Sequence, residues 1–204
     1  MGLYSRWIYP RLCDGLMGLP ALAEQRKLAL AGVGGDVLEI GFGSGRNLAH
    51  YPGHVRRITT VDPNPGMARL ARRRIAAGGI EVDRRASGGE ALPFGGETFD
   101  CVVCTWTLCS IPEAGRAVSE VYRVLKPGGR FIFLEHGLSG DPKVRAWQRR
   151  LNPIEGVVGD GCRLDLDVEA VVRGQPFGRV ELERFEMAKL PRTHGTMYRG
   201  SALK

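Results

Sequence analysis

The sequence predicts an α/β fold in which a seven-stranded, mostly parallel sheet carries helices on both faces and ends in an antiparallel strand. Short apolar runs of strand length alternate with longer runs whose apolar residues recur at helical spacing. A glycine-rich turn follows the first apolar run, as it does where a parallel strand leads into a helix. The 204 residues are enough for one sizeable core, so we expect a single domain.

The elements follow one another in a regular order. Strands are predicted over 36–41, 56–62, 80–85, 99–106, 129–136, 179–187 and 195–202, and helices over 66–77, 113–125 and 165–174. Strands separated by helices imply right-handed crossovers and a parallel sheet, which is a Rossmann-like arrangement. The final two strands are close enough in sequence to be antiparallel neighbours, and 152–163 is rich in turn formers.

Three parts of the single domain are distinguished. Residues 1–34 are expected to form an amino-terminal helical cap, 35–136 a cofactor-binding core, and 137–204 a substrate-side segment with the last strands. The aromatic stretch "YSRWIYPRL" is interpreted first as a helix that covers the core and second as a cap over cofactor and substrate. Part of 142–165 is expected to fold over the crevice as a lid.

Composition excludes several function classes. The net charge of +7 is carried mainly by arginines in "RLARRR" (69–74) and "RAWQRR" (145–150), which we interpret as solvated helix faces. No nucleic-acid motif accompanies them, so no nucleic-acid partner is expected. No apolar run is long enough to span a membrane and no secretory signal is visible, which predicts a cytoplasmic protein without integral membrane contact. The basic faces leave peripheral contact with an anionic membrane open.

The five cysteines are interpreted as reduced, buried thiols, because their number is odd and they lie in apolar surroundings. Cys101 and Cys104 form a CxxC, but the strand period sends residues three apart to opposite faces. We therefore expect neither a redox pair nor a bound metal.

The loop after the first strand, "GFGSG", is predicted to bind a ligand. A ligand can approach the backbone at Gly41, Gly43 and Gly45. The segment "RNLAHY" that follows them is expected to begin a helix whose amides receive a carboxylate. The candidates are a dinucleotide and S-adenosylmethionine, and the spacing GxGxG differs from the dinucleotide pattern GxGxxG. Glu39 in the strand is expected to hold the loop amides or, through water, an ammonium group. Asp62 is expected to bind ribose hydroxyls, with a helix cap as the alternative.

Four blocks carry a family resemblance. "VLEIGFGSGRN", "VDPNPGM", "GGEALPFGGETFDCVVC" and "VYRVLKPGGRFIFLEH" resemble the class I S-adenosylmethionine-dependent methyltransferases, especially the ubiquinone/menaquinone-methyltransferase-like group, over about 36–136. The resemblance implies S-adenosylmethionine as cofactor and S-adenosylhomocysteine as product. The implied cofactor-binding residues are Glu39, Gly41, Gly43, Gly45, Asp62, Pro63, Gly88, Gly89, Glu90 and Thr105. Gly88 replaces the acid that family members often direct at adenine, so backbone groups of 88–90 and the apolar Leu92 are expected to contact that base.

A second likeness concerns the methyl acceptor. "VVCTWTLCSI", "LEHG" and "GDGCRL" look like the small-thiol S-methyltransferases of the animal methyltransferase-like family and their bacterial relatives. The animal members carry an apolar amino-terminal membrane anchor, which is not expected for this chain. It implies a small-molecule acceptor, with a thiol or sulfide preferred. N-, O- or C-methylation of a phospholipid headgroup, quinone or natural product is the alternative, and a non-catalytic S-adenosylmethionine-binding protein is the alternative of another class. A monomer or homodimer is expected.

The acceptor pocket is expected beyond the fourth and fifth strands. The catalytic candidates are His136, Thr105 and Cys109, and the pocket candidates are Tyr4, Trp7, Trp106, His136, Asp160 and Cys162. His136 is expected to be a proton acceptor or thiolate partner, because imidazole titrates near neutral pH, with a bond to a backbone carbonyl as the alternative. Cys162 is interpreted as a packing residue, since methyl transfer needs no covalent enzyme intermediate, and His194 as incidental.

Overall fold

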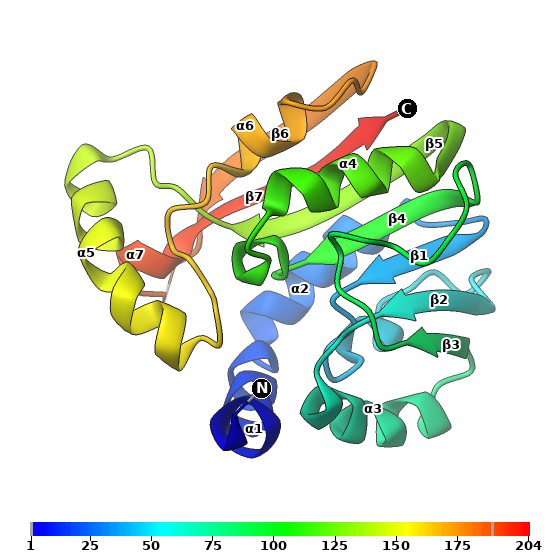
Figure 1. The fold of residues 1–204 in the computed structure, drawn as a ribbon, viewed down its shortest axis with the longest axis horizontal. Helices are drawn as coiled ribbons and strands as arrows, with labels where there is room; N and C mark the ends of the chain where they lie inside the picture. The colour runs from blue at the N-terminus through cyan, green and yellow to red at the C-terminus, as the bar shows by residue number, and fades with distance from the viewer. Residues whose placement is uncertain (1, 189) are drawn as a thin grey trace.

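The structure is a computed structural model that describes residues 2–188 and 190–204. Its centre is a seven-stranded sheet in the order β3-β2-β1-β4-β5-β7-β6 (Figure 1). The strands are β1 (Val37–Ile40), β2 (Arg57–Val61), β3 (Glu81–Arg85), β4 (Phe99–Thr105), β5 (Leu125–His136), β6 (Arg179–Glu186) and β7 (Thr196–Leu203). The first five pair in parallel, and β7 is antiparallel to both of its neighbours, β5 and β6. The predicted fold class is confirmed.

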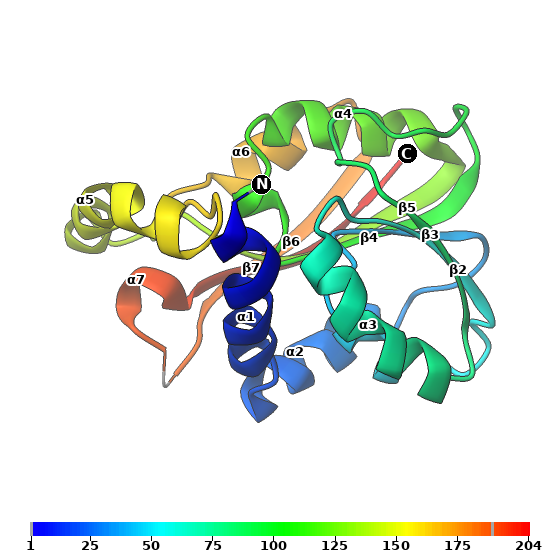
Figure 2. The ribbon, with the colours of Figure 1, turned by 60° about the horizontal axis from the view of Figure 1, so that its bottom comes forward.

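Helices cover both faces of the sheet (Figure 2). On one face lie α4 (Ala114–Val124) and α6 (Val168–Arg173), and on the other α2 (Pro20–Leu30) and α3 (Pro65–Ala77). Each face has its own buried apolar cluster. Cys104 belongs to the first cluster and Cys101 to the second, so the two thiols point to opposite faces as the strand period predicts.

Two helix starts are encoded locally. Asn64 caps α3 by accepting hydrogen bonds from the amides of Gly66 and Met67, with Pro65 in the first turn. Asp141 caps α5 (Pro142–Val158) by accepting from the amide of Lys143. These caps fix where the helices after β2 and β5 begin. Both lie at the carboxyl ends of the strands, where the ligand is expected.

The turn-rich segment predicted over 152–163 is partly wrong, because α5 continues to Val158 with Pro153 inside it. Proline has no amide donor and therefore disfavours the interior of a helix, but tertiary contacts outweigh this preference here. The side chain of Asn152 donates to Asp165 at 2.6 Å and accepts from the amide of Leu164 at 2.8 Å. These bonds tie the last turns of α5 to the chain that follows. The short α7 (Arg192–Gly195) packs beside α5.

The amino-terminal aromatic segment does not cover the core, contrary to the first expectation for it. Its π-helical turn η1 (Tyr4–Ile8) has no buried residue, and α1 (Tyr9–Met17) buries only Pro10. Figure 2 shows this segment standing between α3 and α5. Among the residues that the structure describes, no helix combines the length and apolarity that crossing a membrane requires.

Candidate active site

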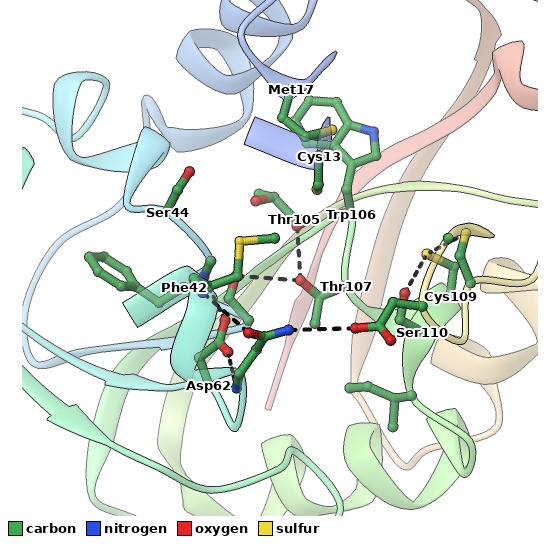
Figure 3. A pocket seen from close by; sticks show the side chains of 18 of the residues that line it. Cys13, Met17, Phe42, Ser44, Asp62, Thr105, Trp106, Thr107, Cys109 and Ser110 are labelled. Carbon is green, nitrogen blue, oxygen red and sulfur yellow. Dashed lines mark hydrogen bonds between the residues drawn. The ribbon is translucent and has the colours of Figure 1, made fainter. Parts of the chain in front are cut away.

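A cavity of about 860 Å³ opens at the carboxyl ends of the parallel strands. It is bordered by the segments that follow β1, β2, β4 and β5, by η1 and α1, and by residues 158–162. In Figure 3, Phe42 and Asp62 lie on one side of the cavity and Cys109 and Ser110 on the other, with Cys13 and Trp106 beyond Thr105. This is the edge of the sheet at which doubly wound proteins bind ligands.

The glycine loop lies against this cavity with left-handed backbone. Gly41, Gly43 and Gly45 have φ of 73°, 56° and 80°. A Cβ on Gly41 would stand 2.0 Å from the hydroxyl oxygen of Thr107, whereas one on Gly43 would meet no atom closer than 3.8 Å. Gly41 is therefore required by packing as well as by conformation, and Gly43 leaves open space beside the loop.

Asp62 fastens that loop to the end of β2. One carboxylate oxygen accepts from the amide of Gly43 at 2.7 Å and the other from the amide of Asn64 at 2.8 Å. Burial raises the pKa of Asp62 in spite of these bonds. The helix-cap alternative is wrong for Asp62, because Asn64 is the residue that caps α3.

Glu39 does not hold the loop amides as expected. Its carboxylate oxygens accept from the side-chain amide of Asn47 at 2.8 Å and the hydroxyl of Tyr51 at 2.6 Å. Asn47 also donates to the hydroxyl oxygen of Thr105 at 3.0 Å, so the side chains of Glu39, Asn47 and Thr105 connect β1, the turn after the glycine loop, and β4. Complete burial raises the pKa of Glu39 to about 7, although the bonds from Tyr51 and Asn47 oppose the shift.

The Glu39 pKa makes a stability prediction. In the folded protein the Glu39 carboxyl keeps its proton up to about pH 7, whereas in the unfolded chain it has the ordinary pKa of 4.5. Between these two pH values the native state therefore binds more protons than the unfolded state. The free energy of unfolding of the ligand-free protein should fall as pH rises through this window, by at most about 3 kcal/mol from this group. Urea unfolding at several pH values should show that Glu39→Gln removes this component. Parallel pH curves for the two proteins would contradict the assignment.

The residues expected near adenine lie at the cavity wall, with one exception. Gly88, Gly89 and Glu90 line it, but Leu92 does not and is buried in the core instead. Pro63, also expected to bind the cofactor, lines the cavity too. A Cβ on Gly89 would come within 3.1 Å of both Ile111 and Ile40, so this glycine lets the 88–90 backbone pack closely on the core.

Arg26 is a buried cation at the cavity that sequence reasoning missed. Its side chain is 4% exposed, donates to the carbonyl of Met17 at 2.8 Å and lies 4.6 Å from the ring centre of Trp106. The guanidinium Nε is buried without a hydrogen-bond partner among the described residues. Burial lowers the pKa of Arg26 to about 10, so it stays charged near neutral pH. A helical pattern on α2 gives no sign of this role, because only the tertiary fold brings Arg26 to the strand ends.

Asp14 joins the cap to the glycine loop. It accepts from the hydroxyl of Ser44 at 2.5 Å and from Arg46 at 2.8 Å, and Arg74 of α3 pairs with it at 3.0 Å. Burial opposes ionisation, but these three donors together lower the pKa of Asp14. The predicted helix after the loop is only the 3₁₀ turn η2 (Arg46–Ala49), which is too short to act as a helix amino terminus. Positive charge at this end of the cavity therefore comes from arginine side chains.

The acceptor side brings His136 together with two cysteines. His136 Nε2 lies 3.2 Å from the Sγ of Cys162, and the Cys162 thiol is 3.5 Å from the Sγ of Cys109. His136 Nδ1 is buried and has no partner within the described part of the chain, so the backbone-carbonyl alternative for His136 is wrong. Thr105 and Trp106 border the same space, and Trp106 has the left-handed φ of 48°. A tryptophan held in that conformation is a strained residue of the kind found at functional sites.

The charges of this cluster differ from those of free side chains. Cys162 donates to Cys109, and this bond, together with nearby His136, lowers the pKa of Cys109. The same bond and burial raise the pKa of Cys162. Burial alone would lower the pKa of His136, but the Cys109 thiolate beside it raises it to about 9. His136 is thus a cation at neutral pH and lacks a free lone pair for accepting a proton.

The remaining predicted pocket residues divide into two groups. Tyr4 and Asp160 lie at the mouth, where the Tyr4 hydroxyl donates to the carbonyl of Val158 at 2.6 Å and Asp160 accepts from Ser5 at 2.5 Å. Trp7 is not in the pocket: it is exposed and lies under the guanidinium of Arg69 at 3.8 Å. His194, expected to be incidental, borders the cavity and pairs with Glu155 at 3.3 Å.

The observed groups fit the cofactor that the sequence resemblance implies. The cofactor has a ribose and an amino-acid carboxylate. Asp62 can accept hydrogen bonds from ribose hydroxyls, and there is open space beside Gly43. The Nε of Arg26, which has no hydrogen-bond partner among the described residues, can donate to a carboxylate. The acceptor side offers an imidazole, thiols and hydroxyls at the far wall. The cavity can therefore hold a nucleoside cofactor at the glycine loop and a second, small molecule beside it.

Comparisons with known proteins agree with this geometry. Residues 38–133 match the family model described as a methyltransferase domain. The rat thiol S-methyltransferase TMT1B is 35% identical over 153 residues, covering 72% of this chain and 62% of the relative. A phosphatidylethanolamine N-methyltransferase of Cereibacter sphaeroides is 31% identical over 160 residues, covering 76% of this chain and 77% of the relative. The chain thus spans less than two thirds of the rat protein's length.

A solved structure shows the same fold. A S-adenosylmethionine-dependent methyltransferase of Thermotoga maritima, described as a possible histamine N-methyltransferase, superposes with a TM-score of 0.69 at 21% identity, over 97% of this chain and 98% of that chain. The fold, the family model and the curated relatives agree, and the chain belongs to the class I S-adenosylmethionine-dependent methyltransferases.

Proposed function

We propose that the chain transfers the methyl group of S-adenosylmethionine to a small thiol or to sulfide. The observation that carries the proposal is the placing of His136 and the Cys109–Cys162 pair in the wall of the cavity opposite the glycine loop. The similarity to thiol S-methyltransferases supports the same acceptor class. S-adenosylmethionine supplies an activated methyl group when it is bound.

The cofactor is held by three groups in this proposal. Asp62 keeps acceptor capacity beyond the amides of Gly43 and Asn64 and would bind the ribose hydroxyls. Arg26 would receive the amino-acid carboxylate, and the 88–90 backbone would contact adenine. Glu39 acts through Asn47 and Tyr51, which it orients.

The acceptor side favours a thiol over an amine on grounds of charge. An amine is a cation at neutral pH and must lose a proton to a base before its nitrogen can accept a methyl group. Of the carboxylates that line the cavity on the side of Cys162, Glu155 is engaged by His194 and Asp160 by Ser5. A thiol ionises partly near neutrality and needs only a positive or donor group to hold the thiolate. His136 supplies that charge in this proposal. The protein otherwise aligns the reactants and excludes water, which is the main demand of an in-line methyl transfer.

An acceptor panel tests the proposal. Purified protein is given S-adenosylmethionine with sulfide, alkyl and aryl thiols, and the amines and phenols of matched shape, and release of S-adenosylhomocysteine is measured. We expect turnover on thiols at least about tenfold above that on their nitrogen and oxygen counterparts. Turnover confined to amines or phenols contradicts the proposal, and cofactor binding with no turnover on any acceptor favours a binding-only protein.

A phospholipid headgroup is the second candidate, favoured by the surface around the mouth. Trp147, Ile154 and Val157 of α5 are 55%, 63% and 72% exposed, and Leu12 and Leu16 of α1 are 55% and 65% exposed. Arg11 of α1 and Arg149 and Arg150 of α5 are exposed, as is Arg6 of the neighbouring η1. Apolar side chains among cations suit an anionic bilayer surface. The similar phosphatidylethanolamine N-methyltransferase adds weight.

Vesicle flotation separates the two candidates. A lipid acceptor predicts binding to phosphatidylglycerol vesicles that weakens in high salt and with Ile154→Ser or Val157→Ser, together with methylation of phosphatidylethanolamine placed in the same vesicles. Thr98→Ser, at an exposed residue next to the amino end of β4 and away from the cavity, is the control. Absence of both binding and lipid methylation would remove this candidate.

A further inference from the structure

We propose that Cys109, His136 and Cys162 form a binding site for a thiophilic divalent cation of the zinc class, with an open fourth position that faces the cavity. One ligand atom from each residue lies within 4.8 Å of the other two. All three residues line the cavity at its acceptor side. A metal site is not predicted from the sequence, because the three residues are far apart in the chain and form no ligand motif.

The separations suit tetrahedral coordination. Zinc binds sulfur at about 2.3 Å and imidazole nitrogen at about 2.0–2.1 Å, so tetrahedral ligands stand roughly 3.5–3.8 Å apart. The Cys162–Cys109 sulfurs are 3.5 Å apart, and His136 Nε2 is 3.2 Å from the Cys162 sulfur. These two separations lie within a few tenths of an ångström of the tetrahedral values, and the third pair, the His136 nitrogen and the Cys109 sulfur, lies within 4.8 Å.

The backbone holds the three ligands in place. His136 ends β5 and Cys109 lies in the 3₁₀ turn η3 (Leu108–Ser110) directly after β4, which pairs with β5. The amide of Arg163 donates to the carbonyl of Cys109 at 3.0 Å and so fastens the Cys162 segment to this turn. Asp160 and Gly161 adopt φ of 53° and 97°, which turns the chain back from α5 toward the cluster. The ligands thus come from three elements that the fold already joins.

Charge favours a divalent ion at this place. Cys109 and Cys162 are 2% and 8% exposed, and two thiolates buried there would be costly without a compensating cation. Two thiolates and a divalent ion are together neutral, and their binding releases the protons of the cluster.

The open position suggests what the ion would do, and this step rests on the proposed function. Catalytic zinc keeps three protein ligands and one exchangeable position. A thiol acceptor entering that position loses its proton to solvent and binds as the thiolate. Its sulfur then forms the new bond to the methyl carbon while the sulfonium carbon–sulfur bond breaks and leaves its electron pair on the cofactor sulfur. The neutral thioether product is a weak ligand and departs.

Cobalt is the probe that tests the site without any acceptor. Reduced, chelator-treated full chain is titrated with Co²⁺, and the visible absorption of tetrahedral thiolate-bound cobalt is recorded, followed by displacement with Zn²⁺. We expect one ion per chain, and at least about 100-fold weaker binding in Cys109→Ser and in Cys162→Ser. Cys13→Ser, a cysteine outside the cluster, should leave the spectrum unchanged. S-adenosylmethionine binding by each variant reports that it is folded.

Two results would overturn the site. The first is that the protein binds S-adenosylmethionine but the spectrum of added cobalt stays that of the free ion. The second is that both serine variants give the same cobalt spectrum as the wild-type protein. Thiol turnover is then measured in the chelated protein, where an at least tenfold loss restored by Zn²⁺ is expected. Because the cobalt spectrum is read without acceptor, its failure leaves thiol methylation standing, and failure of thiol turnover leaves the metal site standing.

Discussion

Gly41→Ala is expected to weaken S-adenosylmethionine binding by at least about 100-fold, which corresponds to roughly 2.7 kcal/mol. The new Cβ would stand 2.0 Å from the Thr107 hydroxyl oxygen, on a residue whose φ of 73° already disfavours a side chain. The loop must move away from Thr107, and this displaces the neighbouring amide of Gly43 from Asp62. Calorimetric titration with S-adenosylmethionine measures the loss.

Gly115→Ala is the matched control for that substitution. Gly115 lies in α4, and a Cβ there would meet no atom within 4 Å. Alanine in a helix is more favourable than glycine by up to about 1 kcal/mol, so cofactor affinity should stay unchanged and thermal stability should hold or rise. Equal cofactor affinity in the Gly41 and Gly115 variants would show that the loop geometry does not determine binding.

His136→Ala is expected to lower thiol turnover by about 100-fold while the affinity for S-adenosylmethionine changes little. His136 lies at the acceptor wall, in contact with Cys162 and away from the glycine loop, so its loss removes positive charge from the acceptor side alone. Steady-state turnover on a thiol and calorimetric cofactor binding separate the two effects.

His54→Ala serves as the histidine control, because His54 is exposed, forms a hydrogen bond with the carbonyl of Val33 and is not among the residues that line the cavity. We expect wild-type turnover from it. Thiol turnover by His136→Ala at the wild-type rate would exclude His136 from catalysis and leave the acceptor wall to Thr105, Trp106 and the cysteine pair.

The sheet and its helices could be predicted because their signals are local. Strand and helix bounds follow from the period of apolar residues, and most observed ends lie within one or two residues of the expected ones. The longer β5 and the extension of α5 past Pro153 could not be predicted, because pairing and side-chain contacts with distant segments overrule local preference there.

The cofactor side of the site was predictable in outline and the acceptor side only in part. The glycines and Asp62 carry a pattern of spacing, whereas Arg26 and Asp14 reach the cavity from helices whose sequences show ordinary amphipathic surfaces. The expectation that Trp7 lines the pocket is wrong, because which side chains of a single helical turn face solvent depends on how the amino-terminal segment is oriented. The His136–Cys162–Cys109 cluster joins residues from separate elements, so only the fold reveals it.

The site of methylation on a 2-aminothiol tests the central claim most directly. Such an acceptor offers sulfur and nitrogen in one molecule. A difference in affinity between two separate acceptors therefore cannot bias the comparison. The acceptor is incubated with the protein and S-adenosylmethionine carrying an isotopically labelled methyl group, and the product is identified by mass spectrometry and NMR. The account predicts label on sulfur alone. Label on nitrogen would contradict it and assign the acceptor side to amine chemistry.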